Sequence, residues 1–184
     1  MNVLAVDTTS DRIIVALRTD CGTDYYRGEA GCKKHNSALM KAIDDLLAKN
    51  GIGIGEIDYF GVCVGPGSFT GIRIGVSAVN ALSMAVGKKI VEVVSLETED
   101  DGREKAVLLP CGHGNFYAAR FGKETAYYAL SGEEAEKIDV PKIILEEIVP
   151  EKLLEKTMQK IYAEQFVEQA KPFYLKKSSA ERIE

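Results

Sequence analysis

Short apolar runs separated by polar residues dominate the first half of the chain. Three of them come first and are joined by short polar connections, which is typical of strands in hairpins. These predicted strands cover residues 2–9, 12–20 and 23–30. Two amphipathic segments and two more apolar runs then alternate, and they predict helices and strands in turn. These elements are a helix at 35–51, a strand at 59–65, a helix at 68–87 and a strand at 88–95. The order βββαβαβ indicates an α/β lobe in which an antiparallel meander precedes helix-linked parallel strands.

Residues 96–105 change the character of the chain, because this stretch is polar and acidic. It is the best candidate for a boundary between a lobe at residues 1–97 and a smaller α+β lobe at 98–184. After it, apolar runs predict an antiparallel set of strands, followed by a short helix and a longer one. These elements cover residues 106–111, 115–122, 125–130, 132–138 and 149–171, the last with Leu154, Met158 and Ile161 on one face.

Composition and charge narrow the function classes. Hydrophobic residues make up 46% of the chain and charged residues 28%, and the formal net charge is −5. An acidic chain argues against a surface built mainly to bind nucleic acid, which usually carries a basic excess. The first residues lack the basic and long apolar regions of a signal peptide, and no run approaches the roughly 18 consecutive apolar residues of a membrane span. We therefore expect a soluble, cytoplasmic protein.

Four cysteines stand at positions 21, 32, 63 and 111, and no two of them form a C-x-x-C pair. We interpret them as reduced thiols, the usual state in a cytosolic protein. Cys32 with His35 and Cys111 with His113 leave a zinc site as an alternative, although neither spacing matches a zinc-finger knuckle. We therefore expect no bound metal.

A glycine-rich segment, GPGSFTGIRIG at residues 65–75, follows a predicted strand and opens the next predicted helix. A helix N-terminus of this kind can hold a phosphate. The candidates for a nucleotide site are Asp7, Thr8, Gly65, Gly67 and Ser68. The letters match neither phosphate fingerprint, because no lysine lies between residues 50 and 87 and Thr70 stands where the dinucleotide pattern needs its third glycine. We therefore expect no cofactor.

The glycines instead recur at intervals of four, at Gly67, Gly71 and Gly75. In a helix this spacing makes a groove without side chains, which favours the close approach of another backbone. The side expected to pack on the sheet carries Ile72, Val76, Val79 and Val86. The side left over carries Gly71, Gly75, Ala78, Leu82 and Ala85. An exposed patch of this kind usually marks an interaction site, and we favour a protein partner over burial beneath the second lobe.

No catalytic set is recognisable in the sequence. Asp7 ends the first predicted strand without a partner carboxylate at a recognisable spacing, and the acidic residues from Glu97 to Asp101 are typical of a solvated loop. Ser68 lies outside a G-x-S-x-G motif, and neither H-E-x-x-H nor H-x-x-x-H occurs. We expect a chain without catalytic activity of its own.

VLAVDTTS near the N-terminus and GPGSFTGIRIG after a strand together resemble the signature of the TsaB (YeaZ) family. The resemblance covers about residues 1–95 and returns in the tail KPFYLKKSSA, whereas residues 110–117 depart from the family's pattern. It implies the actin-like ATPase (ASKHA, RNase H-like) fold. It also implies a non-catalytic scaffold subunit of the bacterial machinery that adds threonylcarbamoyl to the adenosine beside the anticodon of tRNAs. A nucleotide-dependent kinase or hydrolase of that superfamily and a glycoprotease-like peptidase remain as alternatives.

The resemblance also implies partners. The family's scaffold pairs with the catalytic subunit TsaD, works with the small ATPase TsaE, forms a homodimer in the absence of TsaD, and reaches tRNA only through the complex. The implied dimer face lies on the helices matching residues 36–49 and 69–86. Its expected residues are Leu39, Ala42, Phe69, Gly71, Arg73, Gly75, Ala78, Leu82 and Ala85. Residues 95–99 carry no histidine where TsaD has its metal-binding H-x-x-x-H pair, so no metal is implied.

Overall fold

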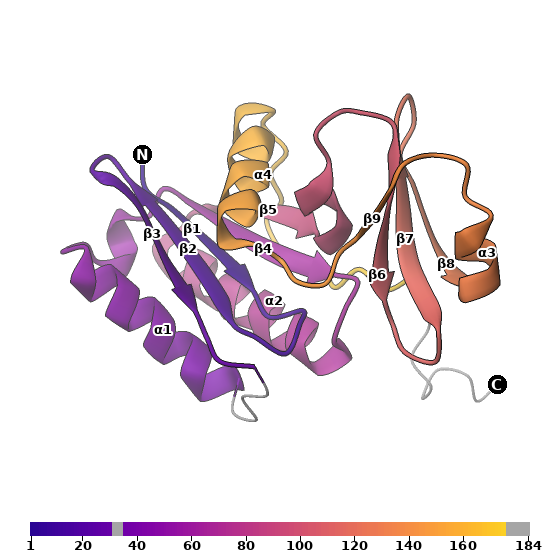
Figure 1. Ribbon diagram of the computed structural model, residues 1–184. Helices are drawn as coiled ribbons and strands as arrows, with labels where there is room; N and C mark the ends of the chain where they lie inside the picture. The colour runs from indigo at the N-terminus through magenta and orange to yellow at the C-terminus, as the bar shows by residue number, and fades with distance from the viewer. Residues whose placement is uncertain (31–34, 176–184) are drawn as a thin grey trace.

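The computed structural model describes residues 1–30 and 35–175 of the chain, and Figure 1 shows two β-sheets with helices around the first. The first sheet has the strand order β3-β2-β1-β4-β5. Its strands are β1 (Val3–Asp7), β2 (Ile14–Thr19), β3 (Gly22–Arg27), β4 (Tyr59–Gly65) and β5 (Lys89–Val94). The pairs β1–β2 and β2–β3 are antiparallel, while β1–β4 and β4–β5 are parallel. The α/β class expected from the sequence is confirmed.

Both faces of the first sheet are covered, which explains why its inner strands read as nearly continuous apolar runs. The helices that cover it are α1 (His35–Lys49), α2 (Phe69–Val86) and α4 (Pro150–Tyr162). The first two lie on one face and α4 on the other (Figure 1). Alternate residues of β1 serve the two faces. Leu4 and Val6 pack in the core with α1 and α2, whereas Val3 and Ala5 pack in the core with α4.

The second sheet has the strand order β8-β7-β6-β9. Its strands are β6 (Lys105–Pro110), β7 (Asn115–Phe121), β8 (Ala126–Ser131) and β9 (Lys142–Ile144), with the short helix α3 (Gly132–Glu136) between β8 and β9. β6, β7 and β8 pair antiparallel, as the apolar runs predict. β9 pairs parallel with β6 and was not expected, because three residues are too few to show a periodicity.

The position of α4 differs from the expectation. We grouped this helix with the lobe at residues 98–184, whereas Leu153, Leu154 and Met158 pack in a core with strands of the first sheet. The same core holds Val107 and Phe121 of the second sheet. The last part of the chain therefore returns to the first sheet, and α4 shares its core with both sheets.

The length of α4 also differs, because the helix ends at Tyr162 instead of continuing toward Lys171. Val167 then forms an antiparallel bridge with Ile90 at the edge strand β5, and the two backbone hydrogen bonds have N–O distances of 2.9 and 3.3 Å. The residues after Tyr162 thus leave the helix and form hydrogen bonds that cover part of the open edge of β5.

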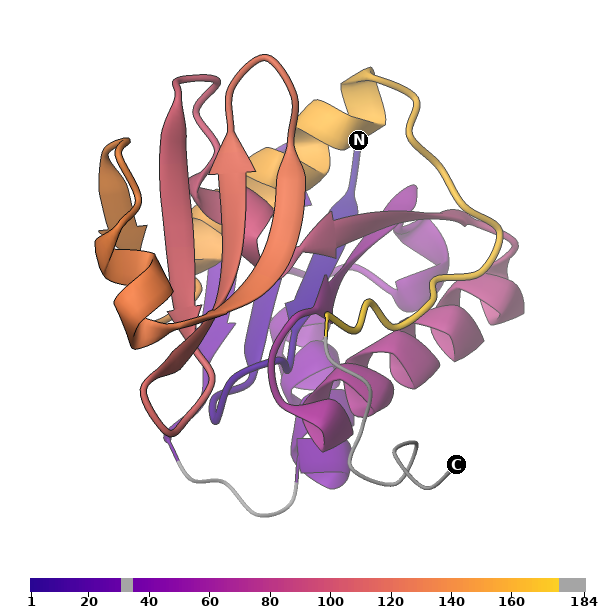
Figure 2. The same ribbon diagram turned by 90° about the vertical axis from the view of Figure 1, so that its right-hand side faces the viewer.

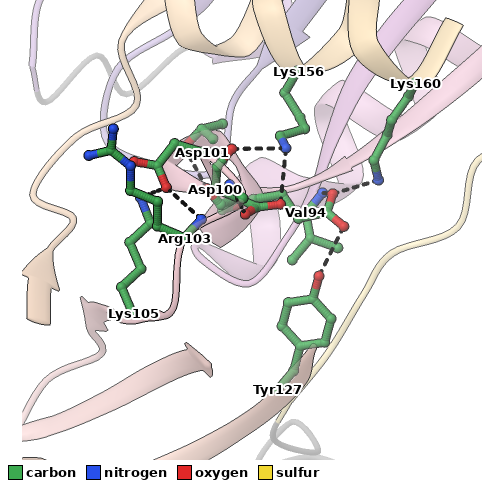
Figure 3. Close-up of polar contacts among 12 residues, drawn as sticks. Val94, Asp100, Asp101, Arg103, Lys105, Tyr127, Lys156 and Lys160 are labelled. Carbon is green, nitrogen blue, oxygen red and sulfur yellow. Dashed lines mark hydrogen bonds and ion pairs between the residues drawn. The ribbon is translucent and has the colours of Figure 1, made fainter. Parts of the chain in front are cut away.

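The acidic stretch after β5 is not a solvated loop, in contrast to the expectation. Its first residues form the short 3-10 helix η2 (Ser95–Glu99), and its carboxylates meet lysines that α4 presents at four-residue intervals (Figure 3). The ion pairs are Lys152–Glu99, Lys156–Asp100, Lys160–Glu97 and, from β6, Lys105–Asp101. Four-residue spacing puts the three α4 lysines on one side of the helix, so the ion pairs fasten α4 to the junction between the sheets.

Glu97 connects three parts of the fold. One carboxylate oxygen accepts a hydrogen bond from Val94 N at 2.9 Å and lies 2.5 Å from Lys160 Nζ. The other accepts from the Tyr127 hydroxyl of β8 at 2.9 Å (Figure 3). Burial and the neighbouring Glu97 carboxylate raise the pKa of Tyr127, which keeps its hydroxyl a donor. One carboxylate thus links β5, α4 and the second sheet.

α2 lies directly against the turn that follows β1, and two glycines permit this approach. A Cβ atom added at Gly71 would lie 1.9 Å from the backbone oxygen of Thr8, and one at Gly75 would lie 2.4 Å from Thr8 Oγ1. The Thr8 hydroxyl donates to the Gly71 carbonyl at 2.7 Å, and Ser68 N donates to the Thr9 carbonyl at 2.6 Å. The close approach that the glycine spacing predicts therefore occurs within the chain, whereas we expected it at a partner.

Gly71→Ala is expected to lower the free energy of unfolding by at least about 2 kcal/mol, because the added methyl group has to displace the backbone of Thr8. Urea unfolding followed by circular dichroism measures the change. Gly55→Ala is the matched control, since a Cβ atom at that position meets no heavy atom within 4 Å. We expect the control to be neutral or slightly stabilising. Equal stabilities of the two variants would contradict the contact.

Lys156→Met is expected to lower the free energy of unfolding by about 1–3 kcal/mol, because it leaves Asp100 without its ion pair. The Lys156 side chain is 10% exposed, and its Nζ lies 3.2 Å from both Asp100 Oδ2 and the Asp100 carbonyl. The control is Lys41→Met on α1, whose side chain is 74% exposed and pairs with Asp45. This exposed pair should contribute less than about 0.5 kcal/mol. A urea-unfolding comparison that gives equal losses would show that burial of the α4 pair has no effect.

Candidate functional site

Asp7, the first of the nucleotide-site candidates, lies sealed at the end of β1. Its side chain is fully buried, and one carboxylate oxygen accepts from Thr9 N at 2.8 Å. The other oxygen has no hydrogen-bond partner among the residues that the structure describes. Burial raises the pKa of Asp7 to about 6, and the hydrogen bond from Thr9 opposes this shift. The carboxylate is therefore desolvated and out of reach of a ligand at the surface.

A cleft of about 390 Å³ lies above this turn, between the two sheets. From the first lobe Thr9, Gly67 and Ser68 line it, and from the second lobe Cys111 and Tyr117. Its charged lining residues in the described part of the chain are acidic: Asp11, Glu146 and Glu147. Of these, Glu147 is already paired with Arg27 and Arg12.

The cleft does not fit a magnesium–nucleotide complex, which the actin-like superfamily would imply. Phosphates need cationic or free N–H donors, whereas the described lining offers hydroxyls and carboxylates. Of the five candidates only Gly67 and Ser68 border the cleft. Thr8 is occupied by α2, and a Cβ atom at Gly65 would lie 2.8 Å from the Phe173 carbonyl of the C-terminal tail. The five candidate residues thus lie near one another, as the sequence predicts, but in the described structure they do not form a phosphate cradle.

The zinc alternative remains untested, because Cys32 lies outside the described residues. The other pair stands in the turn between β6 and β7, where Cys111 N donates to the Asn115 carbonyl at 2.9 Å and His113 has a positive φ of 52°. Within residues 1–30 and 35–175, no three His, Cys, Asp or Glu side chains converge as metal ligands would.

The residues expected at a partner face fall into two groups. Leu39 and Ala42 are buried in the core between α1 and the sheet, and Gly71 and Gly75 are buried beneath Thr8. These four are not available to a partner in this structure, which corrects the expectation. The reason is that α1 and α2 direct their most regular apolar positions to the sheet, and the glycine stripe is used by the chain itself.

The outer side of α2 holds the rest of the expected residues. Phe69, Arg73 and Ala85 are exposed, while Ala78 and Leu82 are half-buried. Met84 belongs to the same side, is 83% exposed and was missed. Its helical spacing from Ser77 and Ala81, both exposed, is the signal that would have found it. We call the exposed side from Phe69 to Ala85 the outer face of α2.

α2 also has the length and hydropathy of a membrane-spanning helix, although we expected no such segment. Its polar residues Arg73, Ser77, Asn80 and Ser83 interrupt the apolar run, which is why the sequence pattern did not reveal it. Here its inner residues pack in the core of the first sheet, as an amphipathic core helix does.

The chain after α4 crosses α2 and reaches its N-terminal end (Figure 2). The Asn80 side chain donates to the Ala170 carbonyl at 3.0 Å and accepts from Ala170 N at 2.8 Å. Phe173 N donates to the Val64 carbonyl at 2.8 Å. The sequence reasoning missed these contacts, because nothing local to Asn80 indicates a tail residue that follows it by 90 positions.

Comparison with curated proteins finds relatives over much of the chain. The "tRNA threonylcarbamoyladenosine biosynthesis protein TsaB" of Escherichia coli K12 is 28% identical over 153 residues, which cover 79% of this chain and 65% of the relative. The protein of the same name from Bacillus subtilis 168 is 34% identical over 99 residues, which cover 53% of this chain and 43% of the relative. The chain thus spans less than two thirds of the length of either relative.

Comparison with solved structures establishes the fold. YeaZ from Pseudomonas aeruginosa superposes with a TM-score of 0.77 at 22% identity, covering 95% of this chain and 99% of that one. A second structure, an uncharacterized protein with similarity to peptidase YEAZ from the same organism, reaches a TM-score of 0.80 at 21% identity and equal coverage. The actin-like (RNase H-like) fold expected from the sequence is confirmed.

A family model described as "TsaD: tRNA N6-adenosine threonylcarbamoyltransferase" matches residues 29–139, more than half of the chain. The matched segment runs from the end of the meander through α2 and β5 into the second sheet. The names of the curated relatives agree with this match. The chain therefore belongs to the family of tRNA N6-adenosine threonylcarbamoyltransferase and TsaB (YeaZ) proteins.

Proposed function

We propose that this chain is a non-catalytic subunit of the complex that forms threonylcarbamoyladenosine in tRNA, and that it pairs with a TsaD-like catalytic subunit. The observation that carries the proposal is the contrast between the two sides of α2. The described residues that line the cleft beside its first turn include no cation for a nucleotide, while the outer face of α2 leaves Phe69, Arg73 and Ala85 exposed. The names of the curated relatives supply the reaction.

The segment after β5 supports the non-catalytic role. Residues 95–99 carry no histidine, and they form η2, in which Glu97 and Glu99 are engaged by lysines of α4. A carboxylate held in an ion pair inside the fold is a poor metal ligand, because coordination would leave the lysine unpaired. This segment therefore serves the fold, and the chemistry is left to the partner.

The outer face of α2 supports the pairing role. It combines exposed apolar, aromatic and arginine side chains, the composition that protein interfaces favour. A homodimer through the same face would compete with the TsaD-like subunit for one surface. The TsaE-like ATPase and tRNA would join through the assembled complex, because an acidic chain with a net charge of −5 has little attraction for RNA by itself. This role places the chain in the cytoplasm.

Ala78→Arg and Ala85→Arg should each raise the dissociation constant for the TsaD-like subunit by at least about 100-fold, because a charge would have to be buried at the interface. Ala85 is exposed, so its variant should fold normally even if the change at half-buried Ala78 disturbs the helix. The matched control is Ala163→Arg, an exposed alanine after α4 on the opposite side of the sheet. Isothermal titration with the purified partner measures the effect. If both α2 variants bind the subunit with native affinity, the outer face of α2 is not the binding surface.

A nucleotide-dependent kinase or hydrolase is the enzyme alternative, and the cleft distinguishes it from the scaffold. Titration of the isolated chain with ATP and magnesium is expected to give a dissociation constant weaker than about 1 mM, because Asp7 is sealed and the described cleft lining offers no cation. Micromolar binding would favour the enzyme. A peptidase would need a metal or nucleophile set, and stoichiometric zinc in elemental analysis would favour that alternative.

A further inference from the structure

Arg73 is the only charged side chain on α2, and two aromatic residues hold its guanidinium in place. Its central carbon lies 3.9 Å from the centroid of the Phe69 ring, and its Nε donates to the Tyr174 hydroxyl at 3.1 Å. The two rings stack on each other with centroids 5.2 Å apart. A flexible side chain is thereby fixed by one neighbour on α2 and by one in the C-terminal tail.

The remaining donors of this guanidinium have no partner in the described chain. Arginine carries five N–H donors, and only the one on Nε is used by a described residue. No described carboxylate lies within ion-pair distance of Arg73, whereas Arg12, Arg27 and Arg120 all form ion pairs. Within residues 1–30 and 35–175, the exposed fork of Arg73 is thus oriented and has no ion-pair partner, a combination that lowers the entropy cost of binding an anion.

The surface beside Arg73 is apolar. A groove of about 530 Å³ runs between α1 and α2, where Met40, Ile74 and Ala78 supply aliphatic side chains. Thr70 and Ser77 contribute hydroxyls. Arg73 is the one cation among the described residues that line this groove, which therefore matches an apolar side chain that has a carboxylate close to it.

We propose that Arg73 gives the outer face of α2 its charge specificity, and that its guanidinium binds a carboxylate in the segment of the TsaD-like partner that docks there. This inference rests on the proposed function. A protein carboxylate is favoured over an RNA phosphate, because phosphate binding relies on several cations together. In the described part of this acidic chain, Arg73 is the one cation that lines the apolar groove.

Tyr174 is the positioning residue for this contact. The tail that carries it is tied to α2 by the paired hydrogen bonds of Asn80 with Ala170, and to β4 by the bond from Phe173 N to the Val64 carbonyl. The tail therefore holds the Tyr174 hydroxyl where it orients the Arg73 guanidinium, and the tail is part of the proposed partner surface.

The test measures the dissociation constant for the purified TsaD-like subunit at about 50 mM and about 300 mM salt, where screening differs most for an exposed pair. Arg73→Met should weaken binding about 10- to 100-fold and flatten its salt dependence. Arg73→Lys should weaken it about 3- to 10-fold, because an ammonium group lacks the planar fork. Tyr174→Phe, which keeps the ring and removes the hydroxyl, should lower affinity about threefold. Arg103→Met, the loss of an exposed arginine far from α2, should leave binding unchanged.

Each result decides between the proposals. If the wild-type chain binds the subunit and Arg73→Met binds with the same affinity and salt dependence, the inference is wrong while the proposed function stands. If the wild-type chain does not bind at all, both fail. Loss of tRNA binding by isolated Arg73→Met in a gel-shift experiment would assign the arginine to RNA and overturn the carboxylate. Restored binding when Arg73→Glu is paired with a carboxylate-to-lysine change in the partner's docking segment would identify the contact directly.

Discussion

The backbone contact between α2 and the turn after β1 determines how both sides of this helix are used. Gly71 and Gly75 bring the helix onto Thr8, and the Thr8 hydroxyl then bonds the Gly71 carbonyl. Because the helix lies so close, the turn that would form the floor of a nucleotide site is filled by the chain's own atoms. The same contact sets the rotation of α2 about its axis, which directs Phe69, Arg73 and Ala85 outward. One packing arrangement thus both fills the turn beneath the cleft and leaves the outer face of α2 exposed.

The second constraint is the set of charges that holds α4 between the sheets. Lysines at one-turn intervals meet the acidic stretch after β5, and Glu97 extends the connection to Tyr127 of the second sheet. On the other side of the fold, Glu147 ties the segment before α4 to Arg27 of β3. Partly buried pairs of this kind add modest stability but strong geometric preference, since removal of one member leaves a charge without its partner. The small second lobe is therefore joined to the first at a defined orientation.

The C-terminal tail connects these two constraints to the surface. It leaves α4, covers the edge of β5 at Ile90, and ends against Phe69 and Arg73 at the start of α2. The helix that carries the proposed partner face is consequently supported by the last described residues of the chain as well as by the sheet. Such support favours the proposed scaffold role, because a docking surface that is ordered before binding loses less entropy when the complex forms.

Much of the local structure follows from the sequence. The apolar runs identify the strands of the first sheet and the antiparallel set of the second, and helical periodicity identifies α1, α2 and one face of α4. The glycines at intervals of four predict a close backbone approach. These inferences succeed because periodicity, turn chemistry and the geometry of a missing Cβ are properties of neighbouring residues.

Only the tertiary structure decided which surfaces meet. The glycine stripe shows that something lies close to α2, but not that it is Thr8 of the same chain. The apolar face of α4 shows that it is buried, but not that the first sheet lies beneath it. The acidic run has the sequence of a solvated loop, and only the structure shows that lysines of α4, more than 50 residues later, contact it. In each case the deciding contact joins residues far apart in the chain. Which distant segments meet depends on the path of the chain through the whole fold, and no local sequence pattern specifies that path.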